Sequence, residues 1–286
     1  MFTHKSVVRL AQALCLGVVS LGATASPAAA QTPVICDPGA LAAAITAANA
    51  SGGTLDLAPG CTYILSSPLP DITGNVAIDA NHSTLARSSS APAFRILTVD
   101  PGANLYLHEV GITNGDATGS FGGGIANFGT LTLTNSSVRN NTADFSGGIG
   151  NAAGAQATIA DSRIEGNQVS RNGGGIANDG SLTLLRSLVT GNTAGQLGGG
   201  IANDGIVRTQ DSRVVGNQAN TGGGIANIGG GTTNLFHTTV ADNSAANAPG
   251  GILDNAGVVT LTDSRVHGNQ PTNCAGSPVP VANCVN

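Results

Sequence analysis

The sequence predicts an all-β fold, a parallel β-solenoid in which each turn takes about 25 residues. Three observations predict it. The motif GGGIAN and its variants place isoleucines at positions 125, 149, 176, 201, 225 and 252, which recur with a nearly constant period. A second motif, as in SRVVGN, ends in asparagines at 141, 167, 192, 217, 243 and 269, which keep the same period. Short runs between the motifs, such as LTLT (131–134), alternate apolar and polar residues as strands do.

The chain begins with a predicted secretory signal peptide, residues 1–30. Lys5 and Arg9 precede the apolar run ALCLGVVSLGA (13–23), and small residues follow up to Ala30, where we expect cleavage. That run is too short to span a bilayer, and no later segment is long enough. We therefore expect a secreted, soluble protein of 256 residues, which is 286 minus 30.

The composition of residues 31–286 excludes nucleic acid as a partner. Nine arginines remain once Lys5 and Arg9 leave, and all sixteen acidic residues remain, so the net charge is 9 − 16 = −7. No lysine is left, there is no tryptophan, and no basic patch can neutralise phosphates.

Both ends of the solenoid carry predicted caps, which protect unpaired strand edges. Residues 31–60 form the N-terminal cap, with a helix over 37–50 that has Asp37 as N-cap and Pro38 at the first helical position. Leu41, Ile45 and Ala48 share one face of this helix. The solenoid spans 61–270, and the proline-rich and cysteine-rich segment 271–286 forms the C-terminal cap.

Four cysteines remain after residue 30, and an even number in an exported chain predicts two disulfides. Local pairing gives one bridge at each end, Cys36–Cys61 and Cys274–Cys284, although sequence alone leaves other pairings open.

Three short strands and three bends fill each predicted turn. Glycines in GGGIAN permit positive φ at a tight bend, and the isoleucine points inward onto its copies in the turns above and below. The asparagines of both motifs form ladders of amide hydrogen bonds between turns. Asn114 lies about one period before Asn141 and is expected to extend the second ladder backwards.

The alternation of GGGIAN with SSVRNNTA (136–143) resembles the GGAI and FxxN repeats of chlamydial polymorphic outer-membrane proteins. It is also similar to secreted bacterial right-handed β-helix proteins with a pectate-lyase-like fold. The resemblance covers residues 104–270 well and 54–103 loosely. It implies a right-handed parallel β-helix that meets polysaccharides or cell surfaces, but that fold hosts lyases, hydrolases, adhesins and structural modules.

A column of charged and polar side chains is the main candidate site. Six residues before each ladder asparagine lie His108, Asn135, Asp161, Arg186, Asp211, His237 and Asp263. His237, flanked by Asp211 and Asp263, is the predicted base, and Arg186 the predicted charge neutraliser, for β-elimination from a uronic-acid polymer. Two residues further along, Arg163, Arg213 and Arg265 are predicted to hold substrate carboxylates. The column also has a purely structural interpretation, since alternating charges stabilise neighbouring strands.

Asp179 and Asp204, each in the context GIANDG, form a second candidate pair one turn apart. They could share a proton, coordinate Ca²⁺ or match the separation of a retaining glycosidase pair, although Asn-Asp-Gly is also ordinary turn chemistry. No motif indicates a transition metal or another cofactor.

These observations favour a secreted protein that binds polysaccharide and cleaves it as a lyase on an acidic glycan such as pectate or hyaluronan, with glycoside hydrolysis second. The alternative is a non-catalytic adhesion or structural module. Ice binding needs an unbroken threonine array, and Arg208 and Asn234 interrupt the one that is present. The oligomeric state stays open.

Overall fold

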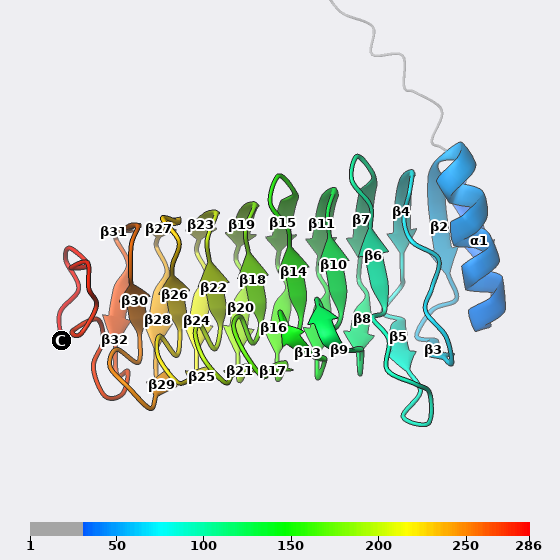
Figure 1. Ribbon diagram of the computed structural model, residues 1–286. Helices are drawn as coiled ribbons and strands as arrows, with labels where there is room; N and C mark the ends of the chain where they lie inside the picture. The colour runs from blue at the N-terminus through cyan, green and yellow to red at the C-terminus, as the bar shows by residue number, and fades with distance from the viewer. Residues whose placement is uncertain (1–30) are drawn as a thin grey trace, which may run out of the picture.

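The computed structural model describes residues 31–286, so the predicted signal peptide lies outside the described residues. The chain coils through about nine turns of about 26 residues, as the sequence predicts. Figure 1 shows the turns stacked side by side, with one helix at the N-terminal end and an irregular segment at the C-terminal end. Within residues 31–286, no helix is long and apolar enough to cross a membrane.

All strand pairs are parallel, and strands from successive turns build four sheets. Sheet A has ten strands: β1 (Gln31–Val34), β2 (Gly53–Leu57), β4 (Asn75–Asp79), β7 (Asn104–His108), β11 (Thr130–Thr134), β15 (Gln156–Ala160), β19 (Ser181–Leu185), β23 (Ile206–Gln210), β27 (Thr232–Phe236) and β31 (Val258–Thr262). Sheet B has nine: β3 (Thr62–Leu65), β5 (Thr84–Arg87), β8 (Gly111–Thr113), β12 (Ser137–Arg139), β16 (Arg163–Glu165), β20 (Leu188–Thr190), β24 (Arg213–Val215), β28 (Thr239–Ala241) and β32 (Arg265–His267).

The other two sheets are shorter. Sheet C contains the GGGIAN strands: β6 (Leu97–Val99), β10 (Ile125–Asn127), β14 (Ile149–Asn151), β18 (Ile176–Asn178), β22 (Ile201–Asn203), β26 (Ile225–Asn227) and β30 (Ile252–Asp254). Sheet D contains β9 (Asp116–Phe121), β13 (Thr142–Phe145), β17 (Gln168–Val169), β21 (Thr193–Ala194), β25 (Gln218–Ala219) and β29 (Ser244–Ala245). Sheet D is a fourth strand per turn where the sequence predicts three. From β17 onward its strands have only two residues, which leaves no alternation to detect.

The repeated isoleucines stack as predicted. Ile176 pairs in register with Ile149 and Ile201, and Ile201 pairs with Ile225. Each of these side chains is 0% exposed. A fully buried isoleucine contributes roughly 1.5–3 kcal/mol, so the stack forms one wall of a continuous core along the solenoid.

Two ladders of buried asparagines run along the solenoid. In sheet C the amides of Asn127, Asn151, Asn178, Asn203 and Asn227 each donate to the next turn at 2.7–3.1 Å, and the last acceptor is Asp254. The second ladder runs from Asn141 to Asn269 at 2.9–3.0 Å. Asn114 does not extend it: the backbone N–H of Gly115, not of Asn114, donates to Asn141 Oδ1. Asn114 instead has a left-handed backbone with φ of 62°.

The predicted N-terminal helix and both predicted disulfides are present. Helix α1 (Pro38–Ser51) begins after Asp37, whose side chain accepts a hydrogen bond from the Ala40 N–H at 2.7 Å. Leu41, Ile45 and Ala48 are its buried residues, as predicted. The bridges are Cys36–Cys61 and Cys274–Cys284. At the C-terminal end, the Asn273 side chain accepts from Asn269, and thus residue 273 continues the second ladder into the cap.

Candidate functional site

The corner between sheets A and B repeats one backbone conformation in seven consecutive turns. One residue per turn has a left-handed backbone with φ between 45° and 52°: Glu109, Asn135, Asp161, Arg186, Asp211, His237 and Asp263. We call these residues the corner column. The sequence prediction is right for six of them and wrong for His108, which pairs with Thr134 inside sheet A. Both this error and the one at Asn114 come from a single residue of misregister in the turn before Asn135.

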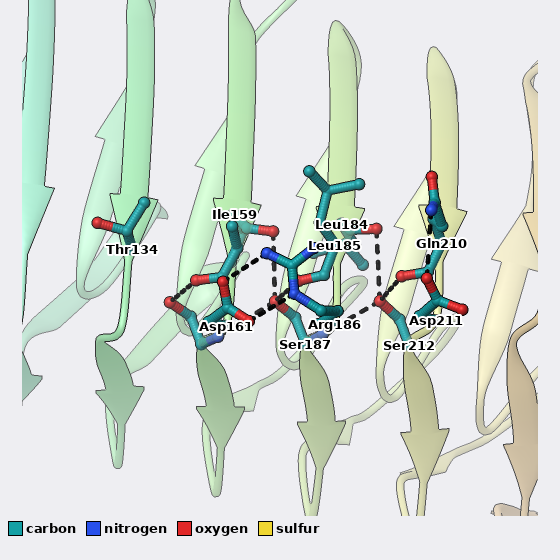
Figure 2. Close-up of polar contacts among 12 residues, drawn as sticks. Thr134, Ile159, Asp161, Leu184, Leu185, Arg186, Ser187, Gln210, Asp211 and Ser212 are labelled. Carbon is teal, nitrogen blue, oxygen red and sulfur yellow. Dashed lines mark hydrogen bonds and ion pairs between the residues drawn. The ribbon is translucent and has the colours of Figure 1, made fainter.

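A hydroxyl ladder holds the corner column in place. The residue after each column member from Asn135 onward is serine or threonine. Its hydroxyl donates to the carbonyl two residues earlier, as Ser187 does to Leu185 at 2.8 Å and Ser212 does to Gln210 at 2.8 Å. The same hydroxyl accepts the backbone N–H of the preceding turn, as Ser212 does from Ser187 at 3.1 Å. The side chains of the column therefore project from a rigid corner (Figure 2).

Arg186 binds Asp161, the column member one turn before it. Its Nε and Nη2 donate to the two carboxylate oxygens, both at 2.7 Å (Figure 2). The hydrogen bonds from Arg186 lower the pKa of Asp161 below its ordinary value, and those to Asp161 raise the pKa of Arg186. The predicted charge neutraliser is thus engaged by a carboxylate of its own chain.

His237 lies between the two predicted aspartates. Its Nδ1 is 3.5 Å from Asp211 Oδ1, and its Nε2 is 3.6 Å from Asp263 Oδ2. The imidazole side chain is 49% exposed, which leaves it accessible to a ligand. The ring of Phe236 packs beside it with centroids 3.9 Å apart. The structure therefore brings Asp211, His237 and Asp263 together but places Arg186 two turns away from His237, with Asp211 between them.

The predicted arginines lie in one outward column of sheet B. Register pairs Arg163 with Leu188, Leu188 with Arg213, Arg213 with Thr239, and Thr239 with Arg265. Arginine therefore recurs on every second turn. Arg163 also contacts Glu165 of its own strand at 3.2 Å. Within the described part of the chain, Arg213 and Arg265 form no ion pair.

A groove of about 760 Å³ lies over strands β8, β12, β16 and β20 of sheet B, bordered by the corner column. Asn135, Asp161, Arg163 and Arg186 are the predicted residues in its lining. His82, Glu109, Arg139 and Glu165 also line it, and sequence reasoning did not single them out for function. The spacing of the repeats could have located Arg139 and Glu165, because they lie two residues after the column that contains the predicted arginines. It could not have located His82 and Glu109, because they come from early turns whose register the repeats do not give.

Asp179 and Asp204 lie on consecutive turns, directly after the paired Asn178 and Asn203 of sheet C. They line a separate pocket of about 360 Å³ together with the rings of Phe121 and Phe145. Burial raises the pKa of Asp179, and the negative charge of Asp204 raises it further. The predicted proximity of the two carboxylates is therefore present, and no other acid lines this pocket.

Comparison with known proteins supports the fold. No family model matches the sequence, and no curated protein matches it. The structure is similar to the crystal structure of pectate lyase Pel9A, with a TM-score of 0.54 and 13% identity over 90% of this chain and 79% of that chain. The protein is therefore a right-handed parallel β-helix of the pectate-lyase-like type. At this identity the likeness establishes the fold and carries no residue roles.

Proposed function

We propose that this protein is exported and binds an acidic polysaccharide along the outer face of sheet B. The observation that carries the proposal is the column Arg163, Arg213 and Arg265, in register on every second turn, with Arg163 also lining the groove. Guanidinium groups bind carboxylates with paired hydrogen bonds. The two disulfides agree with an oxidising compartment. The pectate lyase likeness adds the general expectation of a polysaccharide partner.

The spacing of the arginines favours one class of acidic polysaccharide. Paired strands lie about 4.8 Å apart, so arginines on alternate turns stand about 9.6 Å apart. A pyranose ring with its glycosidic bond extends a polysaccharide by about one strand spacing. A chain lying along the solenoid axis would thus present a carboxylate to each arginine if every second sugar is a uronate. Hyaluronan has that pattern, whereas pectate carries a carboxylate on every sugar.

The test is the binding of the mature chain to hyaluronan, to pectate and to a neutral glucan, measured by affinity electrophoresis or calorimetry. The double variant Arg213→Glu, Arg265→Glu removes two exposed contacts worth about 0.2–1 kcal/mol each and adds repulsion, so we expect about tenfold weaker binding. The matched control is Arg208→Glu, which reverses an exposed arginine on sheet A.

Three results would contradict this proposal. The first is equal affinity for the neutral glucan, which would show that carboxylates are not recognised. The second is unchanged binding by the double variant. The third is an equal loss with Arg208→Glu, because that loss would reflect net charge and not the sheet-B column. If the protein instead prefers pectate and the double variant binds it more weakly, the binding site on sheet B stands. Only the inference that every second sugar is a uronate would then be wrong.

Cleavage by β-elimination is a second candidate function, favoured by the position of His237 between Asp211 and Asp263. Arg213 and Arg265 follow those two aspartates by two residues in the same turns. A neutral His237 would remove the proton next to a uronate carboxylate that an arginine holds. The carbon–carbon double bond of an unsaturated sugar would form as the bond to the glycosidic oxygen breaks, and that oxygen would take up a proton from water. Incubation with hyaluronan and pectate should then produce ultraviolet absorbance that His237→Ala abolishes. Binding without such products would leave a non-catalytic adhesion or structural role.

A further inference from the structure

We propose that Asp79, His82, His108 and Glu109 form a binding site for a divalent transition metal ion, with Zn²⁺ as the ion that fits best. The four residues come from two neighbouring turns. Asp79 at the end of β4 and His108 at the end of β7 are register partners. Glu109 follows at the first position of the corner column, and His82 lies in the corresponding bend of the preceding turn with φ of 62°.

The donor atoms of three of the four residues already converge, and His82, whose side chain is 79% exposed, meets the cluster at Glu109. One ligating atom each from Asp79, His108 and Glu109 lies within 4.8 Å of the other two. Glu109 offers one oxygen to each imidazole: Oε1 is 3.5 Å from His108 Nε2, and Oε2 is 3.5 Å from His82 Nε2. Both distances exceed the usual length of an N–H···O bond, about 2.9–3.0 Å. Donors at about 2.0–2.1 Å from a tetrahedral zinc ion stand about 3.3 Å apart, close to the 3.5 Å between Glu109 and each imidazole.

The surroundings of Asp79 and His108 support a metal site over a plain ion-pair network. Oδ1 of Asp79 is buried and accepts no hydrogen bond within residues 31–286, which is costly for a carboxylate oxygen unless a cation compensates it. Nδ1 of His108 contacts Thr134 Oγ1 at 3.0 Å, which orients the ring and leaves Nε2 facing Glu109. Ligating histidines characteristically have such a partner on the second ring nitrogen.

His237 shows why this cluster differs from other contacts between histidine and carboxylate in the protein. Its two nitrogens also lie 3.5 and 3.6 Å from carboxylates, but Asp211 and Asp263 approach from opposite sides, one turn before and one turn after. Those oxygens cannot reach one ion. At His108, by contrast, one oxygen each of Asp79 and Glu109 lies within 4.8 Å of the other and of one ring nitrogen, within reach of a common centre.

The donor set selects the kind of ion. Two imidazoles with two carboxylates suit Zn²⁺ and neighbouring transition metals, whereas Ca²⁺ takes six to eight oxygens. Because His82 and Glu109 also line the sheet-B groove, a bound ion would place positive charge at one end of it. That consequence rests on the proposed polysaccharide function; the metal site itself does not.

The experiment is a titration of the mature chain after treatment with a chelator. Binding of Zn²⁺ is measured by calorimetry, and binding of Co²⁺ is measured by the visible absorption of the bound ion. We expect one ion per chain and a tetrahedral Co²⁺ spectrum. His108→Ala and Glu109→Gln should abolish saturable binding. Thr134→Val, which removes only the partner of His108, should weaken it about 10–100-fold. The matched control is His267→Ala, an exposed histidine at the other end of sheet B.

The absence of saturable Zn²⁺ binding by the wild-type chain would overturn the proposal. So would binding that persists unchanged in both His108→Ala and Glu109→Gln, or an equal loss in His267→Ala. Circular dichroism of each variant identifies misfolding, and Thr134→Val provides a test that keeps all four ligands. These readouts do not involve polysaccharide, so failure of the metal site and failure of the proposed function are distinguishable.

Discussion

The second asparagine ladder makes a quantitative prediction at its centre, Asn192. The substitution Asn192→Ala removes four side-chain hydrogen bonds while the backbone stays in place. Asn192 Nδ2 donates to the Asn217 side chain at 2.9 Å and to the Ile164 carbonyl at 3.0 Å. Its Oδ1 accepts the backbone N–H and the amide of Asn167, both at 2.9 Å. The side chain is 0% exposed, so water does not replace these partners.

The expected loss of stability follows from these contacts. Three of the hydrogen bonds contribute about 1 kcal/mol each, which gives about 3 kcal/mol. Loss of the fourth leaves the buried N–H of Asn167 without its acceptor, which costs about 1–3 kcal/mol. We therefore expect the free energy of unfolding to fall by about 4–6 kcal/mol. This is larger than most single substitutions cause and is typical of a broken buried network.

The assay is guanidinium unfolding followed by circular dichroism, with wild type and variant compared at equilibrium. The control is Asn247→Ala, whose exposed amide donates only to the Asn220 side chain at 3.0 Å, and we expect a change within about 0.5 kcal/mol. A loss below about 2 kcal/mol for Asn192→Ala would refute the reasoning, because it would mean that the ladder bonds contribute little beyond those made with water in the unfolded chain.

Three further predictions concern other parts of the solenoid. Arg186→Met should raise the pKa of Asp161, measured by carbon NMR titration; in the wild type the stabilisation from this pair is complete at neutral pH and is lost as the pH falls below 3.8, the ordinary value. Asp204→Asn should lower the raised pKa of Asp179 and stabilise the protein at pH 7 but not at pH 3, where the Asp179 carboxyl is protonated and the repulsion is absent. Gly200→Ala should cost about 1–3 kcal/mol in chemical denaturation, since its Cβ would lie 2.6 Å from a carbonyl oxygen on the next turn. A neutral result in any of the three would show that the named contact is weaker than its geometry indicates.

The corner column shows which positions the repeat period predicts correctly and which it does not. From Asn135 to Asp263 the turns differ in length by no more than a single residue, so counting from the asparagines places every column member correctly. Before Asn135 the turns are less regular: the interval between the register partners Asp79 and His108 is three residues longer than that between His108 and Thr134. The misplacement of His108 has another cause: the count starts from Asn114, whereas the ladder position of that turn is Gly115. The histidines and carboxylates of the proposed metal site lie in these irregular turns and were not recognised together.

Arg186 shows a second limit. The register of the strands determines its place in the column. Its ion-pair partner depends on the side-chain rotamer, since Asp161 and Asp211 lie at equal distance along the sequence on either side. The structure selects Asp161. Similarly, the alternation of apolar and polar residues predicted that the arginines of sheet B point outward. It did not predict the groove beside Arg163, which depends on small residues in the same lining, such as Gly111 and Ser137.

The sequence by itself determined the solenoid, its stacked isoleucines, its asparagine ladders and its N-terminal helix. It could do so because a parallel solenoid places residue i over its counterpart one turn later, and so a period in the sequence is a direct record of contacts. Only the tertiary structure decided which outward side chains meet, where the groove lies and how Asp79, His108 and Glu109 converge. Those features depend on side-chain rotamers and on turns of unequal length, and a repeat period carries no information about either.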